Sequence, residues 1–104
     1  MVAKKNLCLT IRIKKNDELN GKRLYKELLD FMMDAGISGA TVLNGTDGFG
    51  KRGKSTLHIE GISINYPLII EVVDEEAKLE PLIPQIKKMV GDNGLISIHE
   101  VDVL

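Results

Sequence analysis

Cysteine is nearly absent from this sequence, which has a single thiol, Cys8, among 104 residues. One cysteine cannot form an internal disulfide or a thiolate metal cluster, and such a composition is typical of a protein in the reducing cytosol. A charge excess of either sign is also missing, because 14 basic and 15 acidic residues give a formal net charge of −1. No global positive field is available to hold nucleic acid through its phosphates, so a site for an anion must be local.

Long hydrophobic runs are missing too. The opening segment MVAKKNLCLTIRIKKN contains only a short apolar stretch, which Arg12 interrupts, and this is too short for a signal peptide or a membrane span. We therefore expect a cytoplasmic protein that does not insert into a membrane. The apolar fraction of 43% and the charged fraction of 28% are typical of a globular protein. The length fits a single domain, which we assign to residues 1–104.

A regular spacing of apolar residues predicts the elements of this domain. Every second residue from Leu7 to Ile13 is apolar, as in a half-buried strand, and the spacing from 22 to 35 predicts an amphipathic helix that stops at Gly36. The remaining expected elements are a strand at 40–43, a long excursion or hairpin at 45–65, a strand at 67–74, a helix at 75–90 and a strand at 95–104.

Three details of the second half can be predicted. Asp74 is a suitable N-cap for the second helix, and Pro81 and Pro84 should kink or restart that helix. In the last strand the alternation changes parity near His99, which predicts a bulge or a strand that outlasts its sheet.

The predicted order of elements is βα, β, loop, βα, β. This order is that of the α+β ferredoxin-like βαββαβ sandwich, in which two helices cover one face of an antiparallel sheet. The other face would be bare. Because the strand at 67–74 is apolar at nearly every position, we expect the bare face to be covered by oligomerisation.

The segment GFGKRGKS, residues 48–55, matches the phosphate-loop pattern G-x-x-x-x-G-K-[ST]. In a nucleotide hydrolase this loop opens a helix whose N-terminus helps to bind the phosphates. Here the motif continues into TLHIEGISINYP, whose β-branched residues, glycine and proline predict no helix. Its context therefore argues against an ATP-hydrolysing phosphate loop. Lys51, Arg52 and Lys54 still lie among three glycines, which favours a local anion site over a purely solvated hairpin.

Two longer stretches are similar to a known family: GKRLYKELLDFMMDAGISGATVLNGTDGFG and YPLIIEVVDEEAKLEPLIP. They resemble the PII-like signalling superfamily, and most closely its short single-domain branch, long labelled a domain of unknown function. The resemblance covers residues 18–103. It implies a ferredoxin-like protomer, a trimer packed through its sheets, and a long T-loop between the second and third strands.

The resemblance also implies a ligand site in the cleft between subunits. In nucleotide-binding PII proteins the phosphates are held by the base of the T-loop and by a Gly-rich turn before the last strand. Carried over to this sequence, the candidate ligand-binding residues are Gly45, Gly48, Phe49, Gly50, Lys51, Arg52, Gly53, Lys54, Ser55, Gly91, Asp92, Asn93 and Gly94.

This sequence departs from the PII pattern at both elements. Arg52-Gly53 stands where PII has Gln-Lys-Gly, and the basic residues that flank the second turn in PII are replaced by Met89, Val90 and Leu95. These departures favour a small anionic metabolite such as AMP or another adenine nucleotide over Mg-ATP and 2-oxoglutarate. The expected partners are two further copies of the chain and a protein target, such as a transporter or an enzyme.

Other residues with reactive side chains have simpler explanations. His58 and His99 have no neighbours at metal-ligand spacing, Cys8 lacks a local base, and Glu75 and Glu76 suit the start of a helix. No arrangement of nucleophile, base and orienting group is visible, so we expect no catalytic residue, no metal and no enzyme. The alternatives that stay open are a protein-interaction module without a small ligand and, less favoured, a small ferredoxin-like hydrolase.

Overall fold

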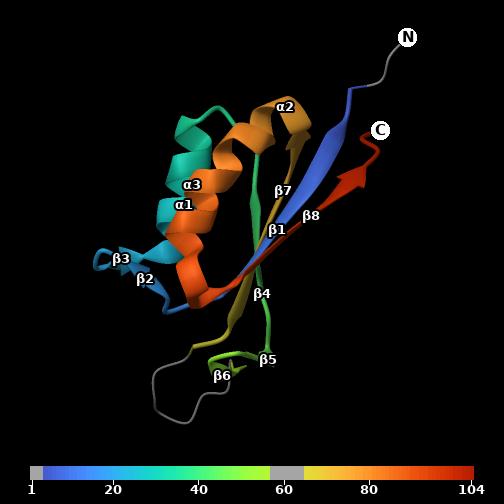
Figure 1. Ribbon diagram of the computed structural model, residues 1–104. Helices are drawn as coiled ribbons and strands as arrows, with labels where there is room; N and C mark the ends of the chain where they lie inside the picture. Colours follow the sequence, from blue (N-terminus) through green and yellow to red (C-terminus); the bar gives the residue numbers. More distant parts are fainter. Residues whose placement is uncertain (1–3, 57–64) are drawn as a thin grey trace.

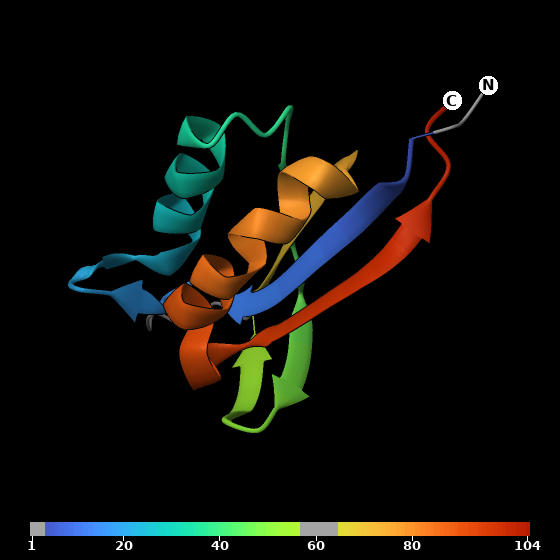
Figure 2. The same ribbon diagram turned by 45° about the horizontal axis from the view of Figure 1, so that its top comes forward.

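The computed structural model describes residues 4–56 and 65–104, and a four-stranded antiparallel sheet lies at its centre (Figure 1). In the order β4-β7-β1-β8, the strands are β4 (Thr41–Asn44), β7 (Pro67–Glu75), β1 (Asn6–Lys14) and β8 (Leu95–Val101). Helices α1 (Leu24–Asp34) and α3 (Ile83–Val90) lie side by side on one face of this sheet (Figures 1 and 2). This is the predicted ferredoxin-like arrangement.

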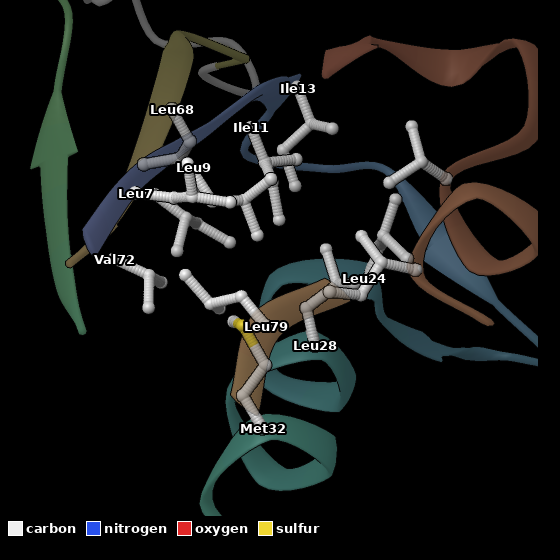
Figure 3. Close-up of a cluster of buried hydrophobic side chains, with 13 residues drawn as sticks. Leu7, Leu9, Ile11, Ile13, Leu24, Leu28, Met32, Leu68, Val72 and Leu79 are labelled. Carbon is white, nitrogen blue, oxygen red and sulfur yellow. The ribbon is translucent and has the colours of Figure 1, made fainter. Parts of the chain in front are cut away.

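The core lies between the sheet and the two helices, as Figure 3 shows. Leu9 and Ile11 of β1 are fully buried there, and Met32 of α1 approaches them from the helical layer. The other buried members of the cluster are Leu7, Ile13, Leu24, Leu28, Leu68, Ile70, Val72, Leu79, Ile86 and Val90. Alternation in β1 and β7 and the helical spacing in α1 and α3 place these residues on the faces that meet in the core.

Short turns set the ends of α1. Two short strands, β2 (Glu18–Leu19) and β3 (Lys22–Arg23), precede the helix and are joined by a turn with two left-handed residues, Asn20 (φ 53°) and Gly21 (φ 82°). An Asn-Gly pair favours this kind of tight hairpin. The prediction therefore started the helix two residues too early. The predicted stop is confirmed, because Gly36 takes a left-handed φ of 87° directly after the helix.

Proline interrupts the second helical segment as predicted. It consists of α2 (Glu76–Leu79), the 3-10 turn η1 (Glu80–Leu82) and α3, and each of the last two has a proline near its start. The prediction of Asp74 as the N-cap was wrong. Asp74 lies within β7, and its carboxylate accepts hydrogen bonds from the Ser38 N–H (2.9 Å), the Ser38 hydroxyl (3.0 Å) and the Glu75 N–H (2.8 Å).

The bulge predicted near His99 does not occur in the pairing between β8 and β1, and β8 does not extend beyond β1. β8 pairs with β1 without a break, from Leu95 opposite Arg12 to Val101 opposite Asn6. The parity change has another cause, because β8 is an edge strand and both of its faces can carry polar groups. Glu100, on the helical side, is exposed and forms an ion pair with Lys5 at 3.0 Å.

The other face of the sheet carries no helix (Figures 1 and 2). The strand register places Leu43, Val73 and Leu95 on this face, and they are 46%, 40% and 60% exposed. Cys8 and Thr10 point the same way but are buried, because β1 is a central strand and both side chains are small. We call this surface the open face. On this face β7 presents the exposed Val73 but also the exposed carboxylate of Glu71, so this side of β7 is accessible and partly apolar in a single chain.

Among the described residues, no helix has the length and apolar character needed to cross a membrane.

Candidate functional site

A cleft of about 470 Å³ lies beside the lower end of the sheet. One wall is a hairpin of β5 (Asp47–Gly50) and β6 (Gly53–Thr56), which extends below the sheet in Figures 1 and 2. The opposite wall is the turn that joins α3 to β8, formed by the 3-10 turn η2 (Gly91–Asn93) and Gly94. The ends of β1 and β7 form its floor. The cleft therefore joins segments that are far apart in the sequence.

The structure brings the two predicted Gly-rich segments together in this cleft. The predicted residues that line it are Gly48, Phe49, Gly50, Lys51, Arg52, Asp92, Asn93 and Gly94. Four others, Gly45, Gly53, Lys54 and Gly91, are not among its lining residues. The side chain of Ser55 lies outside the described part of the structure. As ligand-binding residues, all of them remain a prediction.

The GFGKRGKS segment is a β-hairpin. Gly48 pairs with Ser55 and Gly50 pairs with Gly53, while Lys51 and Arg52 form the turn. The Gly48 N–H donates a hydrogen bond to the Asp47 carboxylate at 3.0 Å, so it is not a free member of an amide nest. Ser55 lies in strand β6 and opens no helix. The segment therefore lacks the structural context of a phosphate loop, as the sequence predicted.

Arg52 connects the two walls of the cleft. Its guanidinium group donates two hydrogen bonds to the carboxylate of Asp17, at 2.8 and 2.9 Å, and a third to the backbone oxygen of Asn93. The bonds to Asp17 raise the pKa of Arg52, although burial acts in the opposite direction. A paired guanidinium group is strongly oriented. Arg52 therefore holds the hairpin, the loop after β1 and the turn before β8 in one arrangement.

Three residues of this region were not predicted as part of the site. Arg12 and Lys14, near the end of β1, line the cleft, and Asp17 holds Arg52 from behind it. The ammonium group of Lys14 donates a hydrogen bond to the backbone oxygen of Lys54 at 3.2 Å. The signal that could have found these residues is the antiparallel topology, which brings the end of β1 next to the start of β8.

Two glycines of the predicted site allow close packing. A Cβ atom at Gly94 would lie 2.1 Å from the backbone oxygen of Arg12 and 2.7 Å from Ile13 Cγ2, so any other residue would clash with β1. A Cβ atom at Gly45 would lie 3.1 Å from the Pro67 side chain, and the Gly45 N–H donates to the Pro67 oxygen at 2.7 Å. Both glycines thus position the walls of the cleft.

The remaining reactive residues do not form a second site. Within residues 4–56 and 65–104, no group of three His, Cys, Asp or Glu residues is arranged to hold a metal ion. His99 is exposed on β8, and His58 lies outside the described residues. The Cys8 sulfur lies 3.9 Å from the Thr10 hydroxyl, at a buried position that fits a packing role.

The fold is that of PII-like proteins. A structure of CPII, a nitrogen regulatory PII-like protein from Thiomonas intermedia K12 bound to ADP, AMP and bicarbonate, superposes with a TM-score of 0.71 at 20% identity, covering 95% of this chain and 88% of that chain. The apo form of CPII gives a TM-score of 0.60 at 19% identity, with 95% and 91% coverage.

Sequence comparison identifies the family within this class. The DUF190 family, described as "Uncharacterized ACR, COG1993", matches residues 6–103, so the chain belongs to DUF190. The UPF0166 protein MJ1524 of Methanocaldococcus jannaschii is 37% identical, over 91% of this chain and 88% of the relative. A UPF0166 protein of Aquifex aeolicus is 34% identical, over 99% and 96%.

Proposed function

We propose that this DUF190 protein is a PII-like regulatory protein that binds a small anionic metabolite, an adenine nucleotide, in the cleft between the β5–β6 hairpin and the turn before β8. One observation carries the proposal: two basic residues from the end of β1, Arg12 and Lys14, and two from the hairpin turn, Lys51 and Arg52, line one cleft. Converging cations of this kind favour a phosphate or carboxylate ligand. The ADP and AMP bound by CPII support the nucleotide class.

Phe49 supports an aromatic ligand. It lines the cleft, yet its side chain is 89% exposed, which is unusual for a phenylalanine in a single chain. An exposed ring beside basic groups can stack on a base while the phosphate contacts the lysine and arginine side chains. A nucleotide would use both features, whereas an inorganic anion would use only the charge.

We further propose that the active assembly is a homotrimer, with the cleft between subunits. Arg12, Ile69 and Leu95 lie in one row on the open face and also line the cleft. A second copy packed on the open face would therefore adjoin the cleft and complete its wall. Burial of the exposed apolar side chains on that face would supply the driving force.

The β5–β6 hairpin is the proposed signalling element. Its turn residues, Lys51 and Arg52, line the cleft, and its strands lead into the segment that corresponds to the T-loop. A ligand that contacts these two residues would change the orientation of the hairpin. Because such a change needs different contacts in the two states, it can alter which protein target is bound. The target class, a transporter or an enzyme, is part of this proposal.

Calorimetric titration tests the ligand. We expect AMP, ADP, ATP or a cyclic nucleotide to bind the purified protein, and Lys51→Ala to weaken that binding by about threefold to tenfold through the loss of one nearby charge. Lys88→Ala, which removes an exposed lysine from α3, is the matched control and should leave binding unchanged. If no nucleotide binds the wild-type protein, the nucleotide proposal fails and a docking role without a small ligand takes its place.

A further inference from the structure

We propose that Asp17 determines the charge specificity of the cleft, because it neutralises Arg52 and so reduces the advantage of ligands with many phosphate groups. This inference rests on the function proposed above, since it concerns which anionic nucleotides the same cleft prefers. Asp17 lies outside both Gly-rich segments, in the loop that follows β1.

The carboxylate of Asp17 is fixed in place by the surrounding backbone. One of its oxygens accepts a hydrogen bond from the Lys14 N–H at 2.8 Å, in addition to its bond to Arg52. The backbone of Asp17 is held as well. Its N–H donates a hydrogen bond to the backbone oxygen of Lys14 at 3.1 Å, and its backbone oxygen accepts one from the Leu24 N–H at 2.8 Å. The side chain is only 6% exposed. Asp17 thus cannot move away from Arg52 without breaking this loop.

Arg52 is therefore committed to Asp17. If a phosphate replaced Asp17 as the partner of the guanidinium group, the buried carboxylate would lose its cationic partner. This loss is strongly unfavourable. The pair instead presents almost no net charge to the cleft. The described contacts of Arg52 use three of its five N–H donors, so Arg52 can still donate a hydrogen bond to a ligand while its charge stays compensated.

The other charged groups of the cleft also nearly balance. Arg12, Lys14 and Lys51 are positive, and Asp47 and Asp92 are negative, which leaves one positive charge over. A terminal phosphate carries a charge of about −2 near neutral pH, and each further phosphate adds about one more. Because Asp17 cancels the charge of Arg52, each further phosphate gains less attraction on this wall of the cleft than it would beside a free guanidinium group.

Asp17→Asn removes the neutralising charge with little change in shape. The amide oxygen of asparagine can still accept the hydrogen bond from the Lys14 N–H, so the loop after β1 keeps its main contact. Arg52 would then present its full charge to a ligand. We expect affinity to rise by about threefold for AMP and by about tenfold for ATP, because the more highly charged ligand gains more.

The experiment is a set of calorimetric titrations of AMP, ADP and ATP into the wild-type protein, Asp17→Asn and Asp30→Asn. Asp30 is exposed on α1, so Asp30→Asn makes the same change of net charge away from the cleft and should leave the ATP-to-AMP affinity ratio unchanged. A rise of that ratio in Asp17→Asn alone supports the inference. An unchanged or lower ratio in a variant that still binds nucleotides overturns it.

Two further results are distinguishable from that outcome. If the wild-type protein binds no nucleotide, the proposed function fails, and the inference about Asp17 fails with it. If thermal unfolding shows that Asp17→Asn is not folded, Asp17→Ser replaces it, because serine also removes the negative charge and its hydroxyl oxygen can accept the hydrogen bond from the Lys14 N–H. Asp17→Ser should also raise the ATP-to-AMP ratio, and a lower or equal ratio contradicts the inference.

Discussion

Asp74 shows how a single buried carboxylate can join two parts of this fold. It lies in β7 and accepts three hydrogen bonds, two from Ser38 and one from Glu75. Burial alone would raise the pKa of Asp74, but the bonds from both residues outweigh burial and lower it below its ordinary value of 3.8. The charged form is therefore the one that stabilises the connection between α1 and β4.

Replacement of Asp74 should reduce stability in a pH-dependent way. Because the folded-state pKa is lower than the unfolded one, the stabilisation is complete above the ordinary value and is lost as the pH falls through the folded-state pKa. We expect Asp74→Asn to lower the free energy of unfolding by about 1–3 kcal/mol at pH 7. In urea unfolding, the difference from wild type should shrink below pH 4. Asp30→Asn, at an exposed position, should show no such trend.

At the level of elements, the turn between α3 and β8 determines the width of the cleft. Gly94 places this turn directly against the backbone of β1, and Arg52 holds it to the hairpin through the Asn93 oxygen. The two walls are thus positioned by one close backbone approach and one guanidinium group. A change in either should affect the cleft before it affects the core.

Gly94→Ala tests this arrangement. The added methyl group would overlap the Arg12 oxygen, so we expect a loss of about 1–3 kcal/mol in the free energy of unfolding together with weaker nucleotide binding. Gly39→Ala is the control, because no atom lies within 4 Å of the Cβ position there. Chemical denaturation and titration measure the two effects. Wild-type stability and binding in Gly94→Ala would show that the turn can shift at no cost.

The elements were predictable from local patterns, but their contacts were not. Alternation in β1 and spacing in α1 depend only on neighbours in the sequence, and they indicated the buried faces correctly. Asp74 was assigned to the wrong element because its partner, Ser38, is 36 positions away. The glycines of the cleft were predicted from a local Gly-rich motif and a family resemblance, whereas the parts played by Lys14 and Asp17 depend on strand pairing and on a loop contact.

At the level of the whole molecule, the open face carries accessible apolar side chains that no helix of the described structure covers (Figure 1). Leu43, Val73 and Leu95 are partly exposed on it, and the buried Cys8 lies on its central strand β1. Such a surface favours association of identical copies over a monomer in water. The proposed trimer and the proposed site are linked, because the cleft opens at the edge of this face.

A charge on the open face should break the assembly. We expect Val73→Glu to convert a trimer into a monomer in size-exclusion chromatography with light scattering, since burial of an unpaired carboxylate is costly. Met33→Glu introduces the same charge at a position on α1 that is 68% exposed, and it should remain trimeric. A monomeric wild-type protein, or a Val73→Glu variant that keeps its mass, would contradict a trimer packed through this face.

The strand order also has a consequence for synthesis in the cell. β1 is made first but pairs with β7 and β8, which are made last, so the centre of the sheet depends on contacts between distant parts of the chain. Such contacts form slowly and late in folding. The cleft needs both Arg12 and the turn at Asp92–Gly94. The proposed ligand site can therefore form only after that turn has left the ribosome.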